Sequence, residues 1–416
     1  MRSLKNDDYN FLPINTALYM GICFFNDDQV ERFQPLTLTR PMDDLRVGIL
    51  TIREKWLKSL GNTQFYRLLP DHLNGVFETG EIEGEDEVLW INSRFLPSGN
   101  FLNALKNLQE GQKIVFKDVT VAAKVNAQSS KEMFSENNFN EEGLEKAEVK
   151  EVIHLEHLWD LLSLNSYEIE KDIQLLGLKS VSEKKGEVPE SVHHPKNTFI
   201  GNDVYIEPGC IFIAEKGPVV IQDGATIEAG SILRGPVVVG EGATVKMAAR
   251  IYDGTTIGPV CKVGGEVAGC IFHSYSNKAH DGFAGNSIFG QWVNLGANTI
   301  TSNLKNDYKN IDVTDWITKD LIQTGRQFLG TVMADHSKTA INTMLNTGTI
   351  CGVSSNVFID ELSPKVIDSF TWLGPRGPAI YRFEKAIEVM QAMMKRRDVD
   401  LTDDYRRMMQ HIFTSR

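Results

Sequence analysis

Histidine, asparagine and basic residues gather in one region of the chain, and together they have the chemistry of a site for an anionic, amine-bearing substrate. Arg250 comes first, His280 and Asn294 follow, and Asn303 and Lys309 close the group. Cationic side chains hold phosphates, asparagine amides orient hydroxyl groups, and an imidazole accepts a proton from an amine. A single loop histidine is more often an ordinary surface residue, so the residue types alone leave both readings of His280 open.

The element that must position these residues is a six-residue repeat. An aliphatic residue occupies every sixth position from Ile221 to Val263. No α-helix keeps one face apolar at this interval, because 3.6 residues per turn do not divide six. Triangular coils do, since each step of six supplies one short strand and one corner, and turn-forming pairs such as Asp223-Gly224 fall at the corners. The repeat therefore predicts a parallel β-helix with an aliphatic interior.

The repeat is interrupted twice. Position 269 is Gly, and the six-step returns at Phe283, two residues out of phase, so we expect the residues from 270 to 282 to form a loop that carries His280. A second departure, from Leu304 to Arg326, precedes the return of the repeat. Insertions in a coil leave its surface as loops, which commonly carry function. Coils of about eighteen residues stack these positions in neighbouring layers.

The residues before the repeat alternate between strand and helix patterns. We expect strands at 22–25, 65–69, 88–92 and 113–116, and helices at 45–60, 101–108 and 157–176. This alternation indicates an α/β layered domain. The polar stretch 128–148 is expected to be an exposed excursion.

These patterns divide the chain into an extension (1–19), an α/β domain (20–181), a charged linker (182–196), the β-helix (197–365) and a C-terminal helical tail (366–416). In the tail, apolar residues from Phe383 to Met394 share one stripe, and Lys395, Arg396 and Arg397 follow. This pattern predicts an amphipathic helix that packs on the coil or on a partner subunit. Its basic last turn suits the helix dipole.

Composition and charge exclude several classes. A net charge of −12 argues against a nucleic-acid partner, because phosphate backbones require a positive surface. Five cysteines without a CxxC motif are expected to be free thiols in a reducing cytoplasm. The first twenty residues lack the apolar core of a signal peptide, and no apolar run approaches the ~20 residues of a bilayer span. We therefore expect a cytoplasmic protein without a membrane partner.

The segments KAHDGFAG (278–285) and IFGQWVNLGANTITSNL (288–304) resemble the acetyltransferase segment of the GlmU family. These bifunctional enzymes (N-acetylglucosamine-1-phosphate uridyltransferase/glucosamine-1-phosphate N-acetyltransferase) make UDP-N-acetylglucosamine from glucosamine 1-phosphate. The chain most resembles a divergent branch found in Bacteroidetes-type bacteria. The resemblance is specific over roughly 197–360 and weak before it.

The resemblance implies a left-handed β-helix, a homotrimer, and acetyl-CoA bound between neighbouring coils. By position, His280 matches the general base that deprotonates the attacking amine. The resemblance assigns the sugar phosphate to Arg250 and Lys309 and the amino sugar to Asn294. It assigns the acetyl-CoA site to Ala297, Asn303 and Ser337, with a backbone N–H near Ala297 for the oxyanion.

Two positions depart from the family pattern. Phe283 stands where the family has a Tyr at the substrate site, and Ala268 stands where a Lys is expected. Both changes leave the identity of the amino sugar open, but they do not alter the expected reaction, which is acetyl transfer to an amine.

For the first domain, the resemblance implies a Rossmann-like uridyltransferase that uses UTP and Mg²⁺. Its first strand normally runs into a glycine-rich phosphate loop, but here Asn26, Asp27 and Asp28 follow the strand without a glycine. A replacement nucleotide site would draw on five residues near strand ends and helix starts, each of which also fits a structural role: Arg40, Arg46, Lys55, Asn92 and Arg94. The metal ligands are not assigned.

Two other functions remain open. One is a sugar-phosphate nucleotidyltransferase whose β-helix serves only for oligomerisation. The other is a non-catalytic scaffold that has lost both sites.

Overall fold

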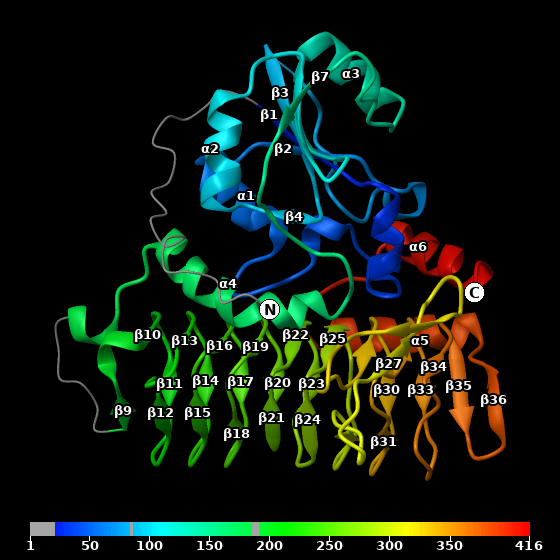
Figure 1. The fold of residues 1–416 in the computed structure, drawn as a ribbon. Coiled ribbons are helices and arrows are strands. Elements are labelled where there is room, and N and C mark those ends of the chain that lie inside the picture. The colour runs from blue at the N-terminus through cyan, green and yellow to red at the C-terminus, as the bar shows by residue number, and fades with distance from the viewer. Residues whose placement is uncertain (1–20, 84–85, 185–190) are drawn as a thin grey trace.

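The computed structural model describes residues 21–83, 86–184 and 191–416. The expected extension at 1–19 and the middle of the expected linker lie outside these ranges. An α/β domain lies along one side of a long coil, and two helices follow the coil (Figure 1). The predicted order of an α/β domain, a parallel β-helix and C-terminal helices is confirmed.

The sheet of the first domain has the order β2-β1-β3-β6-β5-β7. Its strands are β1 (Gly21–Phe25), β2 (Phe65–Arg67), β3 (Glu87–Asn92), β5 (Gln112–Phe116), β6 (Val119–Asn126) and β7 (Glu145–Glu148). β1 is parallel to both β2 and β3, whereas β6 is antiparallel to β3 and β5. A short antiparallel pair joins β4 (Phe95–Leu96) to β8 (Ile153–His154).

Helices cover both faces of this sheet. Ile22 and Phe24 share a cluster with residues of α1 (Ile52–Leu60) and α2 (Gly99–Asn107). Cys23, Phe25 and Trp90 point the other way, towards α3 (Ala127–Ser135). Alternation along the strands thus separates the two layers.

Two expectations for this domain are wrong. The helix expected from 45 begins only at Ile52, because Gly48 has a positive φ of 79° and Thr51 caps the helix with Glu54 in a capping box. The stretch 128–148 is mostly exposed, as expected, but it is not irregular, because it contains most of α3 and all of β7. The strand β6 has no predicted counterpart.

Three parallel sheets form the coil. The first sheet contains β10 (Thr198–Ile200), β13 (Val219–Ile221), β16 (Val237–Val239), β19 (Thr255–Ile257), β22 (Ile271–Ser274), β25 (Ile288–Gln291), β29 (Val332–Met333), β32 (Ile350–Cys351) and β34 (Val366–Ile367). The second sheet contains β11 (Tyr205–Ile206), β14 (Thr226–Ile227), β17 (Thr244–Val245), β20 (Lys262–Val263), β23 (Asn277–Lys278), β30 (Lys338–Thr339), β33 (Asn356–Val357) and β35 (Thr371–Gly374). The third contains β9 (Val192–His193), β12 (Ile211–Ile213), β15 (Ile232–Arg234), β18 (Arg250–Ile251), β21 (Glu266–Ala268) and β24 (Phe283–Gly285). The separate parallel pair β26 (Ile300–Thr301) and β31 (Met344–Leu345) lies next to β24 and continues this side of the coil.

The repeated aliphatic residues fill the coil interior, as predicted. Ile227, Val245 and Val263 are fully buried and lie in register in the second sheet. The corners turn through residues with positive φ, and the predicted corner residues Gly224 and Gly242 have φ of 66° and 60°.

The break near position 269 is not a loop. Residues 270–282 form β22, β23 and the corner after them, and His280 lies in that corner. The change of phase arises because coils here are shorter: Val238 pairs with Thr256, but Thr256 pairs with Ile271. The second departure does leave the coil, as an antiparallel hairpin of β27 (Asp312–Thr314) and β28 (Leu321–Gln323).

The coil extends beyond both expected boundaries. β9 already pairs with β12 before residue 197, and β34 and β35 continue the first and second sheets after residue 365. β36 (Gly377–Ile380) then turns back against β35, and α5 (Phe383–Lys395) and α6 (Asp403–Thr414) follow. The predicted amphipathic helix is confirmed in α5, whose buried residues are Phe383, Ala386, Ile387, Met390 and Met394.

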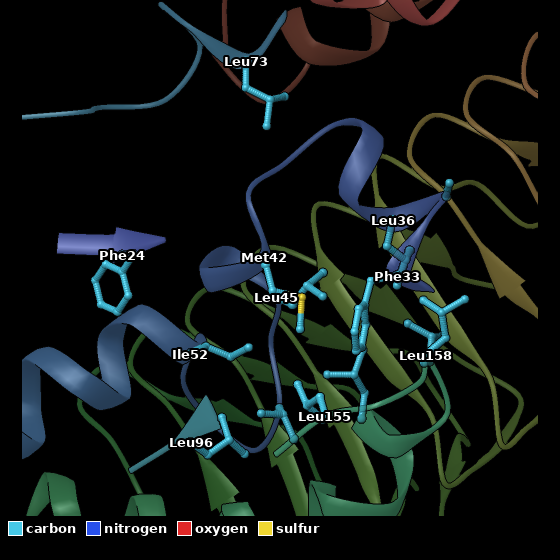
Figure 2. Packing of buried hydrophobic residues seen from close by; sticks show 14 of the residues in the cluster. Phe24, Phe33, Leu36, Met42, Leu45, Ile52, Leu73, Leu96, Leu155 and Leu158 are labelled. Atoms are coloured by element: carbon cyan, nitrogen blue, oxygen red, sulfur yellow. The ribbon is translucent and has the colours of Figure 1, made fainter. Parts of the chain in front are cut away.

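The first domain packs directly on the first sheet. One continuous apolar cluster joins Phe33, Met42 and Leu45 to Ile288 and Val332 of the coil, and Figure 2 shows part of it. The helix α4 (Asp160–Leu176) contacts β16 and β19. Among the described residues, no helix has the length and apolar character needed to cross a bilayer.

Candidate active site

A cleft of about 630 Å³ lies between the outer face of the second sheet and α5. His280, Asn294 and Ala297 line this cleft, together with Lys262 and Arg397. Three of the residues predicted from sequence therefore meet in one place within a single chain. The cleft is open enough that the His280 side chain is exposed to solvent.

A buried lysine fixes the corner that carries His280. Lys278 takes the interior position that Val263 occupies in the preceding coil. Its Nζ donates to the carbonyl oxygens of Gly264 and His280, at 3.0 and 2.9 Å. Burial lowers the pKa of Lys278 to about 8. The corner closes at Gly282, whose φ of 115° strains any side-chain-bearing residue.

Asn294 and Ala297 belong to the next coil. Asn294 bridges Asn277 on one side and Lys338 on the other, which fixes its backbone in the second sheet. The carbonyl of Ala297 accepts a hydrogen bond from Asn342 N at 2.8 Å. Within the described part of the chain, the N–H of Ala297 donates to no protein acceptor. It is thus available to a ligand on the rim of the cleft.

Four of the other predicted residues lie away from this cleft in a single chain. Arg250 stands on the third sheet, about half exposed, with Nη2 3.3 Å from Glu266. Phe283 follows Glu266 in the same sheet. Asn303 donates to Asn286 at 2.8 Å, and the exposed Lys309 forms an ion pair with Asp307 at 3.3 Å.

Ser337 does not line the cleft either. Its side chain is fully buried, and its Oγ donates to the carbonyl of Gly352 at 2.5 Å and accepts from Ser355 N at 2.9 Å. Both hydrogen-bond directions are used inside the coil. The structure therefore does not support the predicted contact between Ser337 and acetyl-CoA.

Several cleft residues have no counterpart among the predicted site residues. Tyr275 and Trp292 occupy equivalent corners of successive coils, and their rings stack 4.4 Å apart at one side of the cleft. Arg396 and Arg397 enter from the end of α5. The basic run after the amphipathic stripe is the sequence signal for these arginines, but a complement to the helix dipole explains such a run equally well.

A second cavity of about 700 Å³ lies in the first domain, at the C-terminal end of β1. Carboxylates dominate its rim: Asp27, Asp28, Asp118 and Glu141. Of the described residues that line it, none is a lysine or an arginine. This is the edge of a parallel pair of strands at which ligands bind in α/β sheets.

Asn92 and Arg94 reach this second cavity only through Asp27. Arg94 Nε lies 2.8 Å from Asp27 Oδ1, and Asn92 Nδ2 lies 2.9 Å from Asp27 Oδ2. Burial raises the pKa of Asp27, but the hydrogen bonds from Arg94 and Asn92 outweigh it and lower the pKa overall. Both predicted residues therefore hold an aspartate at the cavity instead of facing it directly.

Arg40 and Arg46 join the two domains. The buried Arg40 contacts Asp335 of the coil at 2.5 Å and His273 at 3.0 Å. Arg46 Nε donates to the carbonyl of His273 at 3.2 Å. The structure does not support nucleotide contacts for these arginines, because their guanidinium groups are engaged by the coil.

Lys55 is likewise engaged inside the protein. Its fully buried Nζ lies 2.6 Å from Asp172 and 2.9 Å from Glu168, both on α4. A nucleotide contact is not supported for this residue either.

The described residues contain no group of three or more His, Cys, Asp or Glu side chains suited to a metal ion. All five cysteines are buried free thiols. Of the four carboxylates on the rim of the second cavity, Asp27 is tied to Arg94, Glu141 to Lys113 and Asp118 to Lys146, whereas Asp28 forms no ion pair with the described residues. The described residues therefore present no preformed set of Mg²⁺ ligands.

Comparison with known proteins finds a family match for the first domain and several bifunctional relatives of part of the chain. Residues 22–180 match the family of sugar nucleotidyl transferases. The bifunctional protein GlmU of Methanocaldococcus jannaschii is 30% identical over 230 residues, which cover 54% of this chain and 48% of that protein. The bifunctional protein GlmU of Methanococcus aeolicus is 33% identical over 199 residues, covering 47% and 41%.

A third relative is the bifunctional sugar-1-phosphate nucleotidylyltransferase/acetyltransferase of Sulfurisphaera tokodaii, 33% identical over 145 residues that cover 34% of this chain and 36% of that protein. The matches span less than half the length of each of these three relatives. A solved structure of a mutant GDP-perosamine N-acetyl transferase from Caulobacter crescentus aligns over 88% of this chain and 97% of that chain, with 9% identity and a TM-score of 0.16. A score this low carries no weight.

Proposed function

We propose that this chain, a divergent relative of the GlmU proteins, transfers the acetyl group of acetyl-CoA to the amine of an amino-sugar 1-phosphate. Glucosamine 1-phosphate is the leading substrate. The observation that carries the proposal is that His280, Asn294 and Ala297 line one cleft. The five buried free thiols fit a reducing cytoplasm as the place of the reaction.

The proposed reaction is a direct transfer. The substrate amine attacks the thioester carbonyl of acetyl-CoA while the His280 imidazole accepts the amine proton. The carbonyl oxygen becomes an oxyanion, for which the N–H of Ala297 is a suitably free donor. The carbon–sulfur bond then breaks, and the CoA thiolate leaves and takes up a proton. The products are the N-acetylated sugar phosphate and free CoA.

Neighbouring subunits would complete this site. On the side of the coil that the third sheet forms, the outer column exposes Ile300, Met344 and Leu362 at 40%, 37% and 51%. Apolar residues in contiguous exposed positions favour a protein interface. A homotrimer built on this side of the coil would bring Arg250 and Phe283, which stand on the third sheet, towards the cleft of a neighbour.

Nucleotidyl transfer by the first domain is the second candidate. It is favoured by the family match over residues 22–180 and by the cavity at the end of β1. UTP is the nucleotide that the GlmU likeness suggests. Because the described residues present no preformed set of Mg²⁺ ligands, no step through a metal is derived.

The deciding experiment is an assay for free CoA thiol with acetyl-CoA and glucosamine 1-phosphate, followed by other amino-sugar phosphates. Thiol release that requires the amino sugar supports acetyl transfer. Pyrophosphate release from UTP and N-acetylglucosamine 1-phosphate, without thiol release, supports a nucleotidyltransferase whose β-helix only oligomerises. Silence in both assays supports a non-catalytic scaffold.

A further inference from the structure

Three cationic side chains from two distant parts of the chain converge on the cleft that contains His280. Lys262 stands on β20, in the outer column of the second sheet that continues to Asn277. Arg396 and Arg397 follow α5 and enter from the opposite wall. Arg397 Nη2 donates to Asn277 Oδ1 at 3.2 Å, which ties the end of the helix to the sheet beside Lys262.

These cations lack anionic partners. Among the described residues, no carboxylate forms an ion pair with Lys262, Arg396 or Arg397, although the protein as a whole is strongly acidic. Neighbouring lysines do find partners, since Lys246 pairs with Glu228 and Lys395 pairs with Asp400. In addition, Arg397 Nε is buried and has no hydrogen-bond partner. An unpaired buried donor of this kind is costly unless a ligand completes it.

The electrostatics of the cleft agree with the geometry. The pKa of Lys262 is lowered by burial and then by the positive charges of Arg397, Lys246 and Arg396, and the charge of Glu228, which pairs with Lys246, opposes this shift without reversing it. Like charges repel here, and a bound anion would relieve the repulsion. Complementing the dipole of α5 explains a basic last turn, but it explains neither Lys262, which comes from a different element, nor the buried Nε of Arg397.

We propose that Lys262, Arg396 and Arg397 form a phosphate-binding subsite of this cleft. This inference rests on the proposed acetyl transfer and adds an anion site within the same chain, in contrast to Arg250, which stands on the third sheet. Arginine binds phosphate oxygens through paired N–H groups, and lysine adds a point charge. The phosphate has two sources in this reaction, the amino-sugar 1-phosphate and the phosphates of CoA.

The test is direct binding by isothermal titration calorimetry, which needs no turnover. Arg397→Gln and Lys262→Gln are titrated with inorganic pyrophosphate, glucosamine 1-phosphate, CoA and dephospho-CoA. Lys395→Gln is the matched control, because Lys395 belongs to the same basic run but pairs with Asp400 at 3.7 Å. Unchanged circular dichroism and melting temperature show that each variant folds.

We expect both cleft variants to bind pyrophosphate about tenfold or more weakly than the wild type and the control variant. A matching loss for glucosamine 1-phosphate assigns the subsite to the sugar. If the variants bind CoA more weakly than the wild type but bind dephospho-CoA equally well, the subsite holds the 3′-phosphate of CoA. If wild-type protein binds pyrophosphate through these residues but neither substrate, the proposed function fails and the subsite stands. Equal pyrophosphate affinity in all four proteins, or no pyrophosphate binding by the wild type, overturns the subsite.

Discussion

Lys278 holds the carbonyl oxygen of His280 from inside the coil, with its Nζ 2.9 Å away. The same ammonium group also holds Gly264 in the coil below, at 3.0 Å. Val263 occupies the equivalent interior position in the neighbouring coil. At this position Lys278 instead fixes the corner that carries His280. Lys278 is thus a positioning residue for the proposed base.

The first prediction concerns this lysine. Lys278→Met keeps an unbranched chain of similar length but removes both hydrogen bonds to the corner. We expect kcat for thiol release to fall by about tenfold, with little change in KM, because a small displacement of a catalytic group is enough to slow a reaction. Steady-state kinetics check it.

Lys365→Met is the control for that change. Lys365 also donates to a corner carbonyl, that of Thr347, but it does not line the cleft. An unaltered kcat in Lys278→Met, or an equal loss in both variants, would contradict the positioning role.

The second prediction concerns the contact between the domains. Asp335 of the coil accepts from Arg40 at 2.5 Å and from Thr39 at 2.9 Å, and both charged groups are buried. Asp335→Asn removes the closest counterion of Arg40 and leaves Asp44, at 3.1 Å, as its remaining ion-pair partner. We expect the free energy of unfolding to fall by about 1–3 kcal/mol, measured by urea titration. A double variant, Arg40→Met with Asp335→Leu, should recover most of the loss, and equal instability of the single and double variants would refute the explanation.

The third prediction concerns pH. Burial, together with Arg40 and Arg46, lowers the pKa of His273 well below its usual value. In the unfolded chain this imidazole binds a proton below about pH 6.5, whereas in the folded chain it stays neutral. The contribution of His273 to the free energy of unfolding is therefore fully present above that pH and is lost as the pH falls below it. Urea midpoints at pH 7.5 and 5.5 measure the loss.

The matched pair for this effect is His273→Gln and the exposed His193→Gln. The first should show a smaller decrease in midpoint between the two pH values, and the second should behave as the wild type. If both variants lose as much stability as the wild type on acidification, the buried ring is not responsible.

The fourth prediction concerns assembly. Met344→Glu places a carboxylate in the exposed apolar column on the third-sheet side of the coil, between Ile300 and Leu362. We expect light scattering to show a trimer for the wild type and monomers for this variant, because burying an unpaired charge in an interface is costly. Ile317→Glu, at an exposed position in the hairpin, should remain trimeric. A trimer in both variants would place the interface elsewhere.

The coil could be predicted from the sequence because aliphatic residues recur at every sixth position and each of them points into the interior of the coil. The break could not, for an arithmetical reason. A repeat of six that returns two residues out of phase results equally from two added residues or from four removed residues. Ile257 pairs with Phe272, and Phe272 pairs with Phe289, so the coils have lost residues and His280 lies in a corner instead of a loop.

The first domain shows a different limit. Arg40 is a cation near a strand end, which fits a nucleotide site as well as a structural pair. Its shortest ion pair is with Asp335, almost three hundred positions away, and Asp44, four residues away, pairs with it as well. For Arg397 the sequence misleads in the opposite direction. Its position at the end of a helix suggests a purely structural role, whereas its place in the cleft depends on how α5 folds back over the coil. The local sequence shows that a cation is present, but tertiary packing determines which groups it contacts.

The central claim is that His280 accepts the amine proton during acetyl transfer, and one comparison tests it most directly. The rate of CoA thiol release is measured for wild type, His280→Ala and the control His193→Ala, at saturating acetyl-CoA and amino-sugar phosphate. The account predicts a fall in kcat of ~10²–10⁴-fold for His280→Ala alone, with unchanged folding and assembly. Thiol release at the wild-type rate by His280→Ala would contradict it.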